Sequence, residues 1–260
     1  MTRLSTPLLL GGGIAFVLSI TVHATGTFAF LWNYEAIAIV LIGSWIAASA
    51  GTEFGTITDA LRSLRLLAGS PQAFAPLVEW WFNVNLQWRK DGILALNGVE
   101  KTAPDATAAA IVQLCSDGLD ADSIERLARK MVQAQYMRTQ QVISYYRRLA
   151  GYAPTMGLIG TVIGLASALA NGGDSPAILL QRIGFAFSAT LWGLITANFL
   201  WLPIAQRLEK VLFNQQQRDL LHIEAATAIA RGMSPLMTRY QIAMLLSPSE
   251  RSAILRQHAD

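Results

Sequence analysis

The chain has 260 residues, of which 53% are hydrophobic and only 14% are charged. Soluble domains carry charge on about a quarter of their residues, so this composition excludes an ordinary soluble domain and indicates a polytopic membrane protein. The net charge of +3 becomes informative only when its charges are assigned to the two sides of a membrane.

Four segments are apolar over the roughly 20 residues that a helix needs to cross a bilayer. In chain order they are residues 7–25, 28–50, 152–171 and 183–206. A short turn joins the first pair, and another joins the second pair. The sequence therefore predicts an all-α membrane protein with four transmembrane helices in two hairpins and a helical cytoplasmic domain. The predicted parts are a hairpin (1–50), the cytoplasmic domain (51–150), a second hairpin (151–206) and cytoplasmic C-terminal helices (207–260).

The start of the chain has a second interpretation. Arg3, the apolar stretch after it and the small-residue site Val22-His23-Ala24 also fit a cleavable signal peptide. The apolar run is long enough to span the bilayer, and its exit turn leads directly into another span. We therefore prefer the transmembrane interpretation.

The segment between the hairpins has the pattern of packed amphipathic helices. Residues 56–67 have apolar side chains at spacings of three and four before a break at Ser70-Pro71. These side chains are Ile57, Ala60, Leu61, Leu64 and Leu67. Helices are also predicted at residues 77–96 and 105–115. Residues 120–148 are predicted to form a long basic helix that is capped at its start and runs directly into the third span; its positive charge also suits an anionic inner leaflet.

Lys and Arg residues indicate the orientation, because they accumulate in cytoplasmic loops. Of the 20 such residues, Arg3 precedes the first span, eleven lie in residues 51–151 and seven lie from Arg207 onward. Only Arg182 lies on the other side. We therefore expect both termini and the central segment to be cytoplasmic.

Small residues form one face of the third span and one face of the fourth. The face of the third span contains Pro154, Gly157, Thr161, Gly164 and Ala168, and that of the fourth contains Ala186, Ala189, Thr190, Gly193, Thr196 and Ala197, before Pro203. Small faces let helix backbones approach closely. The simplest interpretation is that the two spans pack on each other, and the alternative is that they line a path for ions.

Thr161 and Thr190 lie at matching depth near the middle of these spans. A hydroxyl there either bonds a carbonyl of its own helix or serves an ion or a wet cavity. None of the four spans has Asp, Glu, Lys or His near its middle. A path for ions would therefore need a carboxylate from another chain.

The sequence gives no support for an enzyme or a metal site. The single cysteine, Cys115, excludes an intramolecular disulfide, and the three histidines are too scattered to suggest a metal cage. A phosphate-binding glycine loop, an HExxH motif and a nucleophile elbow are missing from the sequence. We expect no enzymatic activity, no cofactor and no nucleic-acid partner.

The chain resembles the MotA subunit of flagellar stator complexes, within the wider MotA/TolQ/ExbB group, over nearly its whole length. The stretches APTMGLIGTVIGL and FSATLWGLITANFLWLPIAQRLE are similar to the family's paired pore helices. The ending EAATAIARGMSPLMTRYQIAMLLSPSER is similar to the MotA-type tail. Four spans with a large loop between the second and third also match MotA, whereas TolQ and ExbB members have three.

The resemblance implies a homopentamer in the bacterial inner membrane around two copies of a MotB-like protein. That partner's single span carries the ion-binding aspartate, and its other domain binds peptidoglycan. Flow of H⁺ or Na⁺ would rotate the pentamer and generate torque for flagellar motility, through the flagellar rotor protein FliG. The family pattern places these residues on the ion path: Thr161, Thr190, Pro154, Ala189 and Gly157. It places Pro203 and Arg89 in gating and torque.

Two departures from the family pattern leave alternatives open. Ala189 stands where sodium-driven members often carry threonine, which disfavours sodium, whereas Thr161 is compatible with it. The rotor-contacting motif has an Arg, a Gly three residues later and a closing Glu; RKDGILALN supplies Arg89 and Gly92 but ends in Asn97. A non-flagellar motor of the same type is therefore one alternative, and a membrane scaffold is another. A transporter with its own site is disfavoured, because broken helices around a midplane charge are not evident.

Overall fold

The structure is a computed structural model that describes residues 19, 33–68, 73–96, 98–170 and 175–256. These residues form helices and no strand, which confirms the all-α prediction. The first predicted span lies outside the described residues apart from Ser19, and so does the start of the second span. The chain divides into two compact units. Unit one comprises Met1–Leu67 and Gln141–Glu209, and unit two comprises Ala68–Gln140 and Lys210–Asp260.

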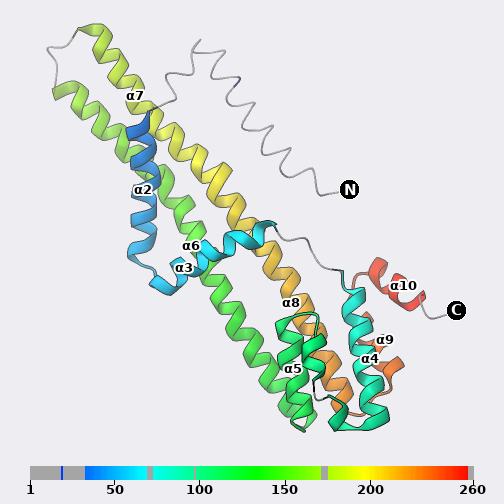
Figure 1. The fold of residues 1–260 in the computed structure, drawn as a ribbon. Coiled ribbons are helices and arrows are strands. Elements are labelled where there is room, and N and C mark those ends of the chain that lie inside the picture. The colour runs from blue at the N-terminus through cyan, green and yellow to red at the C-terminus, as the bar shows by residue number, and fades with distance from the viewer. Residues whose placement is uncertain (1–18, 20–32, 69–72, 97, 171–174, 257–260) are drawn as a thin grey trace. The chain divides into compact units, whose positions relative to one another are not determined.

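Helix α6 (Ala121–Ala170) runs for 50 residues without interruption, as Figure 1 shows. A side-chain oxygen of Asp120 accepts a hydrogen bond from the backbone N–H of Ser123 at 3.2 Å and caps the first turn. Residues 151–170 of the helix carry no charge. The prediction that the basic helix continues directly into the third span is confirmed. Pro154 lies inside α6, where it supplies no N–H to the carbonyl of Ala150.

The fourth span is formed by α7 (Pro176–Ile195), the π-helical turn η4 (Thr196–Trp201) and the start of α8 (Leu202–Ala230). In η4 the backbone N–H of Leu202 reaches back five residues to the carbonyl of Ala197. Pro203 follows directly. A proline offers no N–H to the carbonyl four residues earlier and crowds it, which explains a widened turn at this point. By length and composition, α6 and the continuous stretch Pro176–Ala230 can cross a membrane.

Unit one also contains α2 (Tyr34–Ala50), which packs beside α7, followed by α3 (Phe54–Ser63) and the 3₁₀-helix η1 (Leu64–Ala68). The Tyr146 hydroxyl of α6 donates to the carbonyl of Ala60 in α3 at 2.8 Å. Ile57 and Ala60 are buried as predicted, but Leu61 and Leu64 are exposed. The predicted α-helical spacing fails because the buried face of α3 is narrow and the helix tightens to three residues per turn at Leu64.

Unit two contains the helices α4 (Ala75–Asp91), α5 (Ala106–Ser116), α9 (Pro235–Ala243) and α10 (Pro248–Arg256), the 3₁₀-helices η2 (Ile93–Leu96) and η3 (Val99–Thr102), and the adjoining parts of α6 and α8. Its core contains buried Trp81, Ile111, Ile124, Leu221 and Ile229. Burial of each such side chain contributes about 1.5–3 kcal/mol.

The predicted helix at residues 77–96 is too long, because α4 ends at Asp91. Gly92 follows with a φ of 72°, a positive value that favours glycine and that interrupts the α-helical backbone. The predicted helix at residues 105–115 is confirmed as α5, with Asp105 as its N-cap.

Candidate functional site

The two small-residue faces of α6 and α7 pack directly on each other. A Cβ added at Gly157 would lie 2.7 Å from the backbone oxygen of Ala189, and one added at Gly193 would lie 2.7 Å from that of Ala153. A Cβ added at Gly164 would lie 2.7 Å from the Cβ of Ala186. Only glycine permits backbones this close, so the packing interpretation of the two faces is confirmed for these residues.

Thr161 and Thr190 meet across this contact. Their hydroxyl oxygens are 2.5 Å apart, and Thr161 is buried. The Thr161 hydroxyl also lies 3.1 Å from the carbonyl oxygen of Gly157 and 3.0 Å from that of Ala186. Because this hydroxyl has one proton, it can donate to a carbonyl while it accepts from Thr190. The two predicted threonines therefore form one cluster of four oxygens.

This oxygen cluster can stabilise positive charge, but it contains no negatively charged group. Carbonyl and hydroxyl oxygens can replace part of the hydration shell of a cation. Residues 151–170 and 183–206 contain no Asp or Glu, so these segments supply no carboxylate to the cluster. A charge-bearing ion at this depth would need an anionic group from elsewhere.

Ala189 also lines a cavity beside the same helix pair. The cavity has a volume of about 310 Å³ and is bordered by α2, α6 and α7. Its small-residue wall consists of Gly160, Gly164, Ala186 and Ala189, and its polar residues are Asn33, Glu35, Ser167 and Arg182. Neither Thr161 nor Thr190 is among the described residues that line it, so the hydroxyl pair belongs to the helix contact and not to the cavity wall.

The remaining predicted site residues lie in three other settings. Pro154 packs against Gly193, since a Cβ at Gly193 would lie 3.1 Å from the Pro154 Cα. Pro203 follows the π-helical turn in α8. Arg89, in the last turn of α4, is exposed and donates to the carbonyl of Gly232 at 2.7 Å. Asn97 lies outside the described residues.

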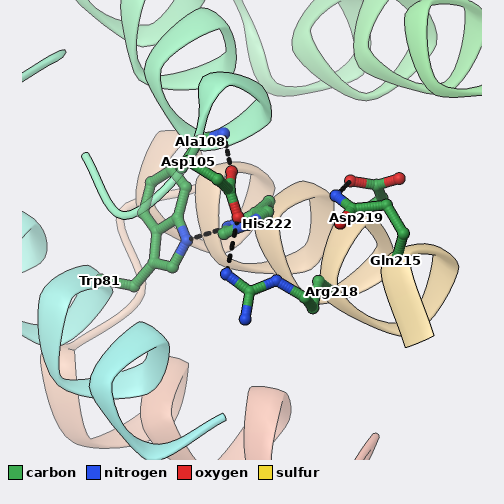
Figure 2. A network of polar contacts seen from close by, with 7 residues as sticks. All are labelled: Trp81, Asp105, Ala108, Gln215, Arg218, Asp219 and His222. Atoms are coloured by element: carbon green, nitrogen blue, oxygen red, sulfur yellow. Dashed lines mark hydrogen bonds and ion pairs between the residues drawn. The ribbon is translucent and has the colours of Figure 1, made fainter. Parts of the chain in front are cut away.

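A second polar centre, which the sequence did not predict, lies in the core of unit two (Figure 2). One oxygen of Asp105 accepts from Arg218 at 2.8 Å and lies 3.1 Å from Nε2 of His222. The other accepts from the backbone N–H of Ala108 at 2.8 Å. Trp81 of α4 donates to Nδ1 of His222 at 2.8 Å. The centre therefore ties α4, the start of α5 and α8 together.

The Trp81 contact defines the protonation of His222. An indole N–H is only a donor, so Nδ1 of His222 must accept and Nε2 must carry the proton that goes to Asp105. The buried cation of this centre is then Arg218. Burial raises the pKa of the Asp105 carboxyl, but the interactions with His222, Ala108 and Arg218 outweigh burial and hold this pKa well below its ordinary value.

Unit two also contains the single cysteine, Cys115, which is buried. Burial raises the pKa of Cys115 to about 12, which keeps it a thiol. Among the residues that the structure describes, no group of three or more His, Cys, Asp or Glu side chains could hold a metal ion.

Asp219 lies next to this centre and is expected to reduce stability. Burial raises the pKa of Asp219, although hydrogen bonds from Gln215 and Thr107 act against the rise. Because the folded-state pKa is raised, the favourable protonated form is lost as the pH rises, and the buried charge is penalised near neutral pH. Asp219→Asn should therefore raise the midpoint of thermal unfolding at pH 7, while Asp117→Asn, at an exposed position, should leave it unchanged. A lower midpoint for Asp219→Asn would contradict this expectation.

Comparisons with known proteins agree with the fold and with the hairpin. A family model for the "MotA/TolQ/ExbB proton channel family" matches residues 99–219. The chain is 28% identical over 256 residues to Motility protein A of Bacillus subtilis (strain 168), which covers 96% of this chain and 93% of that protein. It is also 28% identical over 254 residues to Chemotaxis protein PomA of Vibrio alginolyticus, and the match covers 96% of this chain and 97% of that protein.

A solved structure agrees over the same length. The flagellar MotAB stator complex from Bacillus subtilis contains a chain that superposes with a TM-score of 0.83 at 27% identity, and the match covers 98% of this chain and 100% of that chain. The matched family region, residues 99–219, includes both the Thr161–Thr190 cluster and Asp105. Residues 99–219 of the chain are thus similar to the MotA/TolQ/ExbB proton channel family, and nearly the whole chain is similar to motility protein A.

Proposed function

We propose that this chain is the MotA-type stator subunit of an ion-driven motor, and that it acts as part of a channel and not as an enzyme. Five copies would surround two copies of a MotB-like protein in the bacterial inner membrane. The single observation that carries the proposal is the partly buried Thr161–Thr190 cluster between two spans, residues 151–170 and 183–206, that contain no acidic residue. Such a cluster has a use in ion transfer only when another chain brings a carboxylate, and MotA-type motors divide the work in this way.

The distribution of charge supports the proposed orientation. Eleven basic residues between the hairpins and seven after the fourth span favour a cytoplasmic location for both termini and for unit two. The long helix α6 and the α7–η4–α8 stretch would then each connect the membrane to the cytoplasm. Rotation of the membrane hairpins would be transmitted through these helices to the load.

Four of the predicted residues have a role in this part of the scheme. The Thr161 and Thr190 hydroxyls and the carbonyl of Ala186 would stabilise the H⁺ or Na⁺ that the partner's carboxylate carries. Gly157 would hold α7 close enough to keep the hydroxyls paired. Pro203 would maintain the π-helical turn η4 that precedes it. The coupling ion stays open, because Ala189 disfavours sodium and Thr161 is compatible with it.

The simplest load for this motor is a flagellar rotor, which the chain would contact through a protein such as FliG. A second load is favoured by one sequence observation, the presence of Asn97 where rotor-contacting members close the motif with Glu. Arg89, the matching basic residue, is exposed and within reach of a partner. A non-flagellar load would use the same membrane hairpin and a different partner at Arg89.

Removing the hydroxyls separately tests the proposal. Thr161→Val and Thr190→Val are expected to lower ion-driven rotation or ion flux about tenfold, because a hydrogen bond to a charged group contributes about 1.5–3 kcal/mol. The measurement compares flux in vesicles that contain the chain and its MotB-like partner. Thr155→Val is the matched control, since Thr155 is exposed on the same helix and its hydroxyl donates to the carbonyl of Tyr152 at 2.7 Å.

Assembly separates the motor from the scaffold. Under the motor proposal the Thr161→Val complex keeps its mass and its MotB-like partner but loses flux. Unchanged flux with both valine variants would support a scaffold in which the small faces only hold the oligomer together. Failure to co-purify any single-span partner with an acidic residue in its span would also count against the motor.

A further inference from the structure

Helix α9 exposes an apolar face on unit two. Its Thr238, Arg239 and Ile242 are buried, whereas four large apolar side chains on its other side are 42–58% exposed. These are Leu236, Met237, Tyr240 and Met244, which we call the α9 face. Large apolar side chains grouped on the surface of a domain outside the membrane mark binding sites, and methionine adapts well to a partner.

Contacts between α9 and α4 keep the α9 face on the surface of unit two. The buried Arg239 donates to both carboxylate oxygens of Glu79, at 3.0 and 3.1 Å, and lies 3.9 Å above the ring of Phe82. The side-chain amide of Asn85 donates to the Thr238 hydroxyl at 2.8 Å. Rotating α9 to bury its apolar face would strand a buried guanidinium and a buried amide, which is costly. The exposure is therefore imposed by the fold.

One end of the α9 face is bordered by positive charge. Arg89 donates to the carbonyl of Gly232, three residues before α9 begins at Pro235. Lys90, next to Arg89 in the last turn of α4, is exposed. The only charged residue within α9 itself is Arg239, which is buried. A ligand for this surface thus needs an apolar stripe and an acidic end.

We propose that the α9 face binds an amphipathic helix of a cytoplasmic partner protein, with apolar residues against Met237 and Met244 and acidic residues against Arg89 and Lys90. The inference rests on the proposed motor function, in which Arg89 contributes to output, and extends that contact along α9. A helix that lies on an anionic bilayer carries Lys and Arg along its polar side. Because α9 has no exposed basic residue, its chemistry favours a protein partner over a lipid surface.

A peptide probe tests the chemistry of the partner. The probe is a fluorescent amphipathic peptide helix with leucines on one side and glutamates beside them, and a second peptide carries lysine in place of each glutamate. Binding is measured by anisotropy to the assembled full-length complex in nanodiscs of neutral lipid. The glutamate peptide is expected to bind, and Met237→Asp and Met244→Asp should each weaken it about tenfold or more, because a charge is forced into an apolar contact.

Met137→Asp is the matched control. Met137 lies in the part of α6 that belongs to unit two and is 56% exposed, compared with 53% for Met237 and 58% for Met244. This variant should bind the glutamate peptide like the unaltered complex. Equal binding of both peptides, unchanged binding by the two α9 variants or no binding at all would overturn the proposal. Loss of the assembled mass in both α9 variants would instead assign the face to contacts between copies of this chain.

Ion flux, measured after the same complexes are reconstituted in closed vesicles, distinguishes the two proposals. The α9 variants should keep the flux of the unaltered complex while they lose the peptide. If the unaltered complex conducts no ions, the proposed function fails whatever the peptide does. If it conducts and the peptide result is negative, only the α9 proposal fails.

Discussion

Gly157→Ala is expected to disrupt the contact between α6 and α7, because the added Cβ would lie 2.7 Å from the backbone oxygen of Ala189 and 3.1 Å from the Cα of Thr190. Both are backbone atoms, so only a shift of a whole helix can relieve the overlap. Overpacking of this kind costs about 1–3 kcal/mol. The expected result is a lower midpoint of thermal unfolding for the purified protein in detergent, together with reduced ion flux.

Gly151→Ala is the control for this substitution. Gly151 lies in the same helix, and a Cβ there would have no packing contact within 4 Å among the described residues. Alanine also favours a helix over glycine by up to about 1 kcal/mol, so Gly151→Ala should leave the midpoint unchanged or raise it. Shifts in the same direction for both variants would show that glycine at 157 has no special packing role.

Asp105→Asn is expected to destabilise unit two by about 3 kcal/mol, because it leaves the buried guanidinium of Arg218 without an anionic partner. Asparagine retains a side-chain oxygen that can cap α5. The loss of stability therefore measures the ion pair and not the cap. The expected result is a lower thermal midpoint at pH 7. Asp117→Asn, at an exposed position, should have no such effect.

The same variant should change the response to acid. The pKa of Asp105 is lowered in the folded state, so its stabilisation is complete above the ordinary carboxyl pKa of about 4 and is lost as the pH falls toward the folded-state value. Asp105→Asn should therefore flatten the loss of stability below about pH 4. Arg218→Met added to Asp105→Asn should recover part of the lost stability, since it removes the unpaired charge. A double variant as unstable as the sum of the single variants would contradict the ion-pair argument.

The membrane hairpin could be predicted well from the sequence, because its determinants are local. The run without charges fixed the position of the third span, and the capping residues before it fixed the start of α6. The small residues at spacings of three and four also predicted the α6–α7 contact that Gly157 and Gly193 form. What the pattern could not decide is which small residues meet, since that depends on the offset between two helices.

The centre at Asp105 could not be predicted, because its members are far apart in sequence. Trp81 and His222 are separated by 141 positions, and Arg218 and Asp105 by 113. The available signals are weak: Asp105 appears only as the first residue of a predicted helix, and Arg218 and His222 share one side of α8 at a spacing of four. A histidine in an otherwise featureless helix gives no indication that it is fully buried.

The end of α4 shows a different kind of failure. The aromatic and apolar pattern continued beyond Asp91, and the prediction followed the pattern past Gly92 to residue 96. Glycine within a helical pattern can either continue the helix at a modest cost or end it. Here Gly92 takes a positive φ of 72°, which ends the helix, and the apolar pattern does not encode that choice.

The π-helical turn η4 has a consequence for how the fourth span and α8 are related. A π turn accommodates one residue more than an α turn, and one residue corresponds to about 100° of rotation about the helix axis. In a regular α-helix with 3.6 residues per turn, the side of α7 that carries Ala186, Ala189 and Gly193 would continue along one side of α8. The extra residue of η4 rotates these two sides out of phase. The two halves of one continuous helix can thus meet different neighbours at optimal angles, and the extra residue sets the angular offset between them.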